Sequence, residues 1–128
     1  MYNFIMGDDT YRNSKLKLIP KIVEGNMIVR KLVRGKPVII GKKLPVSYIY
    51  EPAIPSEKKS EYWEVDLDVG SSSKTAKKIV NVCKKYMSSL TVDLGFLIEG
   101  CSEDELPERI LASLRMHQFD TNQSEVLR

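Results

Sequence analysis

The sequence is poor in the residues that build covalent frameworks and metal centres. Two cysteines and one histidine stand among 128 residues, too few for a disulfide framework or a histidine-based metal site. The longest uncharged apolar runs, such as Val38-Ile39-Ile40, are far too short to span a bilayer. Asp8 and Asp9 interrupt the N-terminal stretch early, which does not fit a secretory signal. We therefore expect a cytoplasmic protein that is at most peripheral to membranes.

The composition is that of one ordinary globular domain. Hydrophobic residues make up 42% of the chain and charged residues 29%, which excludes gross disorder and a coiled coil. A chain of 14.6 kDa is large enough for one hydrophobic core. We expect a single domain over residues 1–120, followed by a polar tail over residues 121–128.

Charges of one sign gather in blocks along the chain. Ten Lys or Arg and one acid lie between residues 12 and 43, and five Lys with no acid lie between residues 73 and 85. Six acids lie between residues 51 and 68, and five between residues 99 and 108. Such blocks either neutralise one another across the fold or give a dipolar surface whose basic face attracts phosphate groups.

Hydrophobic periodicity predicts an α+β fold with the order β-hairpin, β, α, β, α, β. We expect a mixed, mainly antiparallel sheet, covered on one face by one long and one short helix. The predicted strands lie over residues 27–33, 38–50 (as one or two strands), 63–69, 90–99 and 114–119, with a hairpin turn at 34–37 and a loop at 51–60. The predicted helices lie over residues 8–19 and 73–90, with a short one opening at Ser102. The strands that flank the long helix are predicted to be parallel neighbours in a βαβ unit.

Several stretches together resemble the C-terminal domain of the plant "enhanced disease resistance 2" family. They cover most of residues 4–119 in the expected order. The matching stretches are GDDTYRNSKLKLIPKIVEG (7–25), GKP (35–37), GKKL (41–44), EVDLDVGSSS (64–73), SLTVDLGFLIEG (89–100) and EDELPERIL (103–111). The family domain is longer, with a substantial upstream segment, so this chain resembles the C-terminal part of that domain. The loop at 51–60 is longer than the family's turn, and the helix over 73–90 is richer in Lys.

The resemblance implies a connection with lipids or membranes. In the plant proteins this domain follows a pleckstrin-homology domain and a START lipid-binding domain, and those proteins are regarded as membrane-associated regulators of defence. It implies no catalytic residues, so we expect a protein that is not an enzyme and needs no cofactor or metal.

The strand-to-helix turn from Gly70 to Thr75 is the strongest candidate site in the residues themselves. Backbone N–H groups at a helix N-terminus, serine hydroxyls and a Lys suit a phosphate or a carboxylate. The turn is not a P-loop, because Ser73 stands where that motif needs Gly before the Lys. The plainer interpretation is that the serines only cap the helix.

Three other patterns have both a chemical and a structural interpretation. Glu64, Asp66 and Asp68 share one strand face and would suit Mg²⁺ or an aspartyl-phosphate chemistry, but solvent exposure or salt bridges explain them more simply. The Lys-bearing helix over 73–90 would contact anionic headgroups, while its apolar stripe suits packing on a sheet. His117 with a cysteine would make a nucleophilic pair, but nothing in the sequence places them together.

The leading hypothesis is a non-catalytic, lipid- or membrane-associated regulatory module. Its partners would be anionic lipid headgroups or a membrane surface, and an upstream lipid-binding domain; weak aromatic interleaving disfavours nucleic acid. The alternatives are a protein–protein docking module within a larger protein and, less favoured, a Mg²⁺-dependent phosphohydrolase. The residues predicted to bind anions or headgroups are Gly70, Ser71, Ser72, Ser73, Lys74, Lys15, Lys17, Lys21, Arg30, Lys31 and Arg34.

Overall fold

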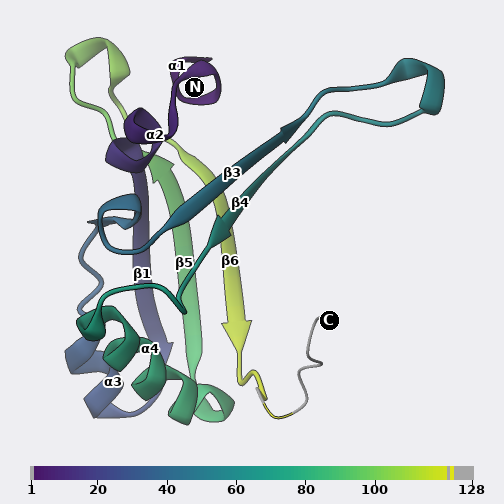
Figure 1. The fold of residues 1–128 in the computed structure, drawn as a ribbon. Helices are drawn as coiled ribbons and strands as arrows, with labels where there is room; N and C mark the ends of the chain where they lie inside the picture. The colour runs from purple at the N-terminus through teal and green to yellow at the C-terminus, as the bar shows by residue number, and fades with distance from the viewer. Residues whose placement is uncertain (1, 121, 123–128) are drawn as a thin grey trace.

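Figure 1 shows a computed structural model of the protein, which describes residues 2–120 and residue 122. The predicted polar tail over 121–128 thus lies outside the described residues, apart from residue 122. The helices are α1 Tyr2–Met6, α2 Asp9–Lys15, α3 Met27–Leu32 and α4 Lys74–Tyr86, with 3-10 turns η1 Ile40–Lys42, η2 Pro55–Glu57, η3 Met87–Ser89 and η4 Glu103–Glu105. The strands are β1 Leu16–Glu24, β2 Val38–Ile39, β3 Val46–Glu51, β4 Tyr62–Leu67, β5 Thr91–Ile98 and β6 Ile110–His117.

The strands form two antiparallel sheets. The larger has the order β2-β1-β5-β6, and the smaller is the β3–β4 hairpin. The α+β class and the mainly antiparallel sheet are therefore confirmed. The predicted βαβ unit is wrong, because β4 and β5, which flank α4, belong to different sheets. Their alternating apolar pattern fits either strand direction, so the sequence could not separate the two arrangements.

The N-terminal half differs most from the prediction. The helix predicted over 8–19 ends at Lys15, and β1 follows from Leu16 with Pro20 inside it. Pairing with β5 along nearly the whole strand overrides the local helix signal. Pro20 fits because β2 pairs with Lys17 and Leu18 only, so that among residues 2–120 and 122 no strand pairs with β1 on that side at the proline.

The strand predicted over 27–33 is wrong, because these residues form α3. The side chain of Asn26 accepts a hydrogen bond from the Ile28 N–H (2.7 Å) and starts the helix. Gly25 precedes it with φ +147°, and a side chain there would collide with Leu90. Without the first strand, the hairpin predicted around residues 34–37 does not exist; the hairpin of this fold is β3–β4, joined by the predicted loop 51–60.

Two clusters of buried side chains lie on one face of the larger sheet. At one end, Phe4, Leu16 and Ile40 pack with Tyr48 and Trp63 of the hairpin. At the other end, Val29 of α3 and residues of α4 pack on β5 around Leu90 and Val92; these α4 residues include Val82, Cys83 and Tyr86. The covering long helix is thus α4, as predicted, but the covering short helix is α3. The short helix predicted at Ser102 is only the turn η4 in the loop before β6.

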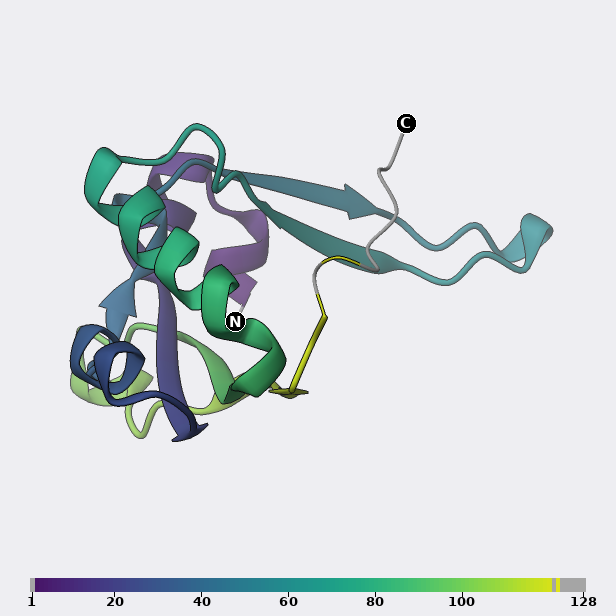
Figure 2. The same ribbon diagram turned by 90° about the horizontal axis from the view of Figure 1, so that it is seen from below.

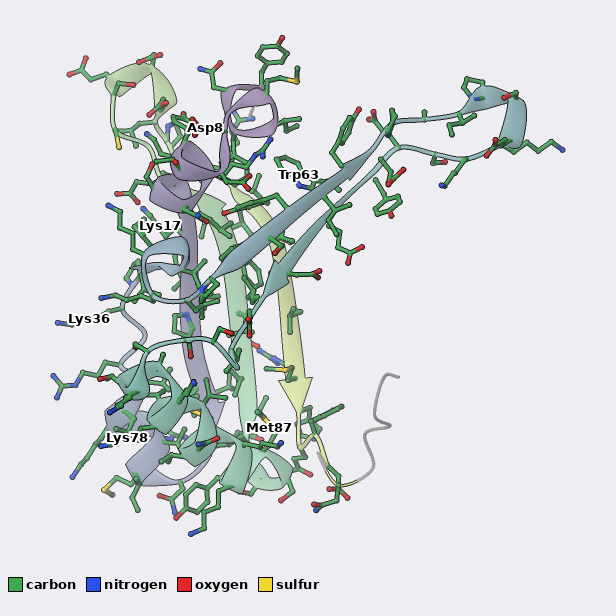
Figure 3. All side chains as sticks on the ribbon, viewed as in Figure 1. Asp8, Lys17, Lys36, Trp63, Lys78 and Met87 are labelled. Atoms are coloured by element: carbon green, nitrogen blue, oxygen red, sulfur yellow. The ribbon has the colours of Figure 1, made fainter. Side chains whose placement is uncertain are left out.

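Helices α1 and α2 are tied to the hairpin by one arginine. The guanidinium of Arg12 donates to the backbone oxygens of Phe4 (3.1 Å) and Ile5 (2.6 Å). It also lies 5.4 Å from the ring centroids of both Tyr48 and Trp63. Figure 3 shows Trp63 where the hairpin passes these helices. This contact fixes the hairpin at its base, while its tip extends away from the rest of the molecule (Figure 2).

Candidate functional site

The predicted turn from Gly70 to Lys74 is held together by its own groups. The Ser73 hydroxyl accepts from the Ala76 N–H (3.3 Å), and the Ser72 hydroxyl donates to the Val69 carbonyl (2.7 Å). The Asp68 carboxylate accepts from the Ser71 N–H (2.9 Å). Hydrogen bonding to Ser71 lowers the pKa of Asp68 below its usual value, so a carboxylate of the chain itself already lies against this turn.

Lys15 and Lys17 point into an acidic loop. The Lys17 ammonium contacts both carboxylate oxygens of Glu108 (2.6 and 2.7 Å) and pairs with Glu99. The Lys15 ammonium lies 3.4 Å from a carboxylate oxygen of Glu105. Only 12% of each lysine side chain is exposed. These two lysines therefore already have anionic partners within the fold.

Hydrogen bonds lower the pKa values of two carboxylates in this loop. Hydrogen bonding to Lys17 lowers the pKa of Glu108, with help from the Gly100 N–H. The backbone N–H of Cys101 is the main cause of the lowered pKa of Glu105. A cleft of about 580 Å³ beside them is walled by acidic and aromatic side chains, including Asp104 and Tyr11. An acidic wall of this kind disfavours a phosphate ligand.

Lys21 lies, like Lys17, on the face of the sheet opposite the helices. It stands opposite Asp93 on β5, whose carboxylate makes two hydrogen bonds with Arg115 on β6 (2.6 and 2.8 Å). The Arg115 contact lowers the pKa of Asp93. Helices α3 and α4 pack against the opposite face of the sheet, so Lys21 is separated from their basic residues.

Helices α3 and α4 lie side by side at one end of the molecule (Figures 1 and 2). Neither helix contains an acidic residue. Their basic side chains, with those just after α3, are exposed, and no described carboxylate forms an ion pair with any of them. They are Arg30, Lys31, Arg34, Lys36, Lys74, Lys77, Lys78, Lys84 and Lys85.

Apolar side chains are exposed among these basic groups. Met27 is 69% exposed, Ile28 54% and Leu32 43%, while Val29 of the same helix is fully buried. Arg30 is partly engaged, because its guanidinium donates to the Val23 and Gly25 carbonyls. Figure 3 shows Lys36 pointing away from the body of the molecule. We call α3, the residues up to Lys36 and the lysines of α4 the α3–α4 surface.

The eleven predicted residues are thus divided among several places. Arg30, Lys31, Arg34 and Lys74 belong to the α3–α4 surface. In the turn before α4, Ser73 caps the helix, whereas Ser72 and Ser71 bond to Val69 and Asp68. Lys15, Lys17 and Lys21 lie elsewhere. Sequence reasoning missed Met27 and Ile28, because it read them as strand residues; Asn26 as a helix cap followed by Arg30 and Lys31 was the available signal.

The other chemical candidates do not assemble. Glu64 and Asp66 lie exposed on the outer face of the hairpin, whereas Asp68 caps the turn. Within the described part of the chain, no group of three His, Cys, Asp or Glu side chains could hold a metal ion. The side-chain partner of His117 is the Thr91 hydroxyl (2.8 Å) and not a cysteine. Burial raises the pKa of the Cys83 thiol, which disfavours the thiolate that a nucleophile needs.

No helix among residues 2–120 and 122 is long and apolar enough to cross a bilayer.

Comparison with known proteins shows the family. Residues 1–120 match the family described as "Protein ENHANCED DISEASE RESISTANCE 2, C-terminal". The chain is also 35% identical over 123 residues to "Protein ENHANCED DISEASE RESISTANCE 2-like" of Arabidopsis thaliana, a match that covers 96% of this chain and 16% of that protein. No solved structure matches. The chain therefore belongs to the ENHANCED DISEASE RESISTANCE 2 C-terminal family, and spans about a sixth of the length of that curated relative.

Proposed function

We propose that this chain is a non-catalytic regulatory module that associates peripherally with anionic lipid membranes through the α3–α4 surface. One observation carries the proposal: exposed Met27 and Ile28 stand among basic side chains that have no carboxylate partner among the described residues. Each part has a function at a membrane. Apolar side chains enter the boundary between headgroups and acyl chains, while Lys and Arg are attracted to anionic headgroups.

The magnitudes favour a reversible, charge-assisted contact. A basic side chain near an anionic membrane contributes about 1 kcal/mol, and full burial of a Met or Ile side chain about 1.5–3 kcal/mol. Several such groups on one surface would be enough for peripheral binding. Because the α3–α4 surface lies on the far side of the molecule from the β3–β4 tip (Figure 1), the hairpin would remain free.

Vesicle co-sedimentation tests the proposal directly. The chain would be mixed with neutral, phosphatidylserine and phosphoinositide liposomes at low and physiological salt. We expect binding to anionic vesicles that persists at physiological salt. The double variant Lys31→Glu/Arg34→Glu should weaken binding by about tenfold or more. Binding that vanishes entirely with salt would instead mean diffuse attraction without insertion.

The hairpin tip offers a matched control. Lys58→Glu/Lys59→Glu makes the same change in net charge at two exposed positions remote from α3 and α4. Equal losses for both double variants would reduce the effect to net charge and contradict a specific surface. Absence of binding to any vesicle would favour the docking alternative. Mg²⁺-dependent phosphatase activity that Asp66→Asn abolishes would support the phosphohydrolase alternative.

A further inference from the structure

β6 ends the larger sheet with one edge unpaired. The sheet order is β2-β1-β5-β6, so among the described residues β6 has a neighbour on one side only. Proteins usually protect such an edge with Pro, Lys or a bulge that turns it away. Between Ile110 and His117 there is no Pro, Lys or acid, and the one Arg, Arg115, is held by Asp93. The register with β5 shifts only at the start of the strand, between Ile110 and Ala112, so the edge from Ala112 to His117 is regular.

The side chains along this edge are apolar and exposed. Ile110 is 63% exposed and Leu114 45%. Register with β5 places Ala112, Leu114 and Met116 on the face that carries the helices, opposite Phe96, Leu94 and Val92. An added strand would therefore continue an apolar row already present on β5.

The hairpin extends past this edge. Figure 1 shows β3 and β4 crossing in front of β6, with the tip beyond it. The hairpin face that packs on the sheet is formed by alternate residues, including Trp63 and Leu67. On the same face, Tyr50, which stands opposite Trp63, is 50% exposed, and Val65, which lies between Trp63 and Leu67, is 38% exposed. The apolar face of the hairpin, with Tyr50 and Val65, therefore projects over the position that the next strand of the sheet would occupy.

We propose that a second copy of this chain fills that place, with the two β6 strands pairing antiparallel about a two-fold axis perpendicular to the sheet. Such an axis keeps each face of the sheet continuous, so a residue of β6 pairs with one from the same face of the partner. The helix faces of both copies then join. Each hairpin extends over the sheet of the other copy, where Tyr50 and Val65 pack on apolar side chains of that sheet.

Charge selects the register. Pairing centred on Leu114 places Leu114 opposite its own copy and Ala112 opposite the partner's Met116. On the other face, Ser113 stands opposite the partner's Arg115, so no like charges meet. Pairing centred on Ala112 would instead set Arg109 opposite the partner's Arg115, an unfavourable pair of like charges. We therefore place the two-fold axis at Leu114.

Mass measurement by sedimentation tests the pairing. As the concentration rises, the apparent mass should increase from 14.6 kDa, the mass of one chain, to twice that value and no higher. Leu114→Lys puts a charge on the edge and should leave only the monomer. The matched control Ile49→Lys changes a side chain of similar exposure on the outer face of the hairpin and should leave the dimer intact. Circular dichroism would confirm that both variants fold.

A cross-link keeps the test independent of the folding of Leu114→Lys. In a chain with Cys83→Ala and Cys101→Ser, Leu114→Cys should form a disulfide between two copies on mild oxidation, because directly opposed residues bring their Cβ atoms within disulfide range. Val80→Cys, on α4, should not. A monomer at all concentrations, growth to larger aggregates, or equal cross-linking of both variants would overturn the proposal; the first of these would mean that another protein segment covers β6.

Discussion

The basic residues at the two ends of β1 have different environments. Where the strand begins, Lys15 and Lys17 are mostly buried and paired with carboxylates of the 99–108 loop. Beyond its other end, Lys31 and Arg34 are exposed and have no described carboxylate partner. In the sequence these residues form one basic block. The difference teaches that a run of charge predicts attraction for anions only where the fold leaves that charge unpaired.

The largest expected effect comes from removing the paired lysine. Lys17→Met should lower the free energy of unfolding by about 2 kcal/mol, because Glu99 and Glu108 would be left side by side without their cation. Urea denaturation of the two proteins measures the difference. Vesicle binding should not change. If Lys17→Met weakened vesicle binding but not stability, the comparison between the two ends of β1 would be wrong.

Lys36→Met is the matched variant at the other end of the strand. Lys36 is exposed and makes no ion pair within the described chain. Its replacement should change stability by no more than about 0.5 kcal/mol. A loss as large as that of Lys17→Met would show that charge at any position stabilises this fold.

Several elements could be predicted from the sequence because their signals are local. The helix α4 has both an apolar stripe and a serine cap, and β5 has strict alternation; both were predicted within a few residues of their observed bounds. The α+β class follows from these patterns. β6 was predicted from residue 114 but begins at Ile110, because exposed apolar residues at a sheet edge carry no alternation to mark the start.

The rest depends on contacts between distant residues. The apolar run from Met27 to Val33 has the composition of a strand, but only Val29 of α3 is buried, and the cap at Asn26 decides the helix. The candidate site has the same limit. Nothing near Lys17 in the sequence indicates Glu108, which lies 91 positions away and removes that lysine from any surface for anions.

A smaller effect is expected from the apolar part of the α3–α4 surface. Met27→Gln/Ile28→Gln should weaken vesicle binding about tenfold, since partial burial of two such side chains contributes on the order of 1–2 kcal/mol. The loss should be similar at low and high salt, because burial of apolar area is not screened. Leu106→Gln/Ile49→Gln is the control, with two exposed apolar residues elsewhere. Equal losses for both pairs, measured by co-sedimentation, would mean that no defined surface inserts.

The smallest expected effect is on the acid side of the stability profile, and it concerns the paired end of β1 alone. The pKa of Glu108 is lowered in the folded chain, mainly by Lys17. A carboxyl with a lowered folded pKa stabilises the fold fully above its unfolded value of 4.5, and this contribution is lost as the pH falls through the folded pKa. Glu108→Gln should therefore be less stable than the natural chain at pH 7, but its stability should fall less as the pH decreases below 4.5. Thermal unfolding over this range measures both slopes.

The exposed Asp104 of the same loop provides the control for that profile. It has no ion pair among the described residues, so Asp104→Asn should keep the acid loss of the natural chain. If Glu108→Gln and Asp104→Asn flattened the profile equally, the general charge of the loop would be responsible. A profile that only Glu108→Gln flattens would identify the Lys17 pairing, in contrast to the unpaired basic end, as the source of the pH dependence.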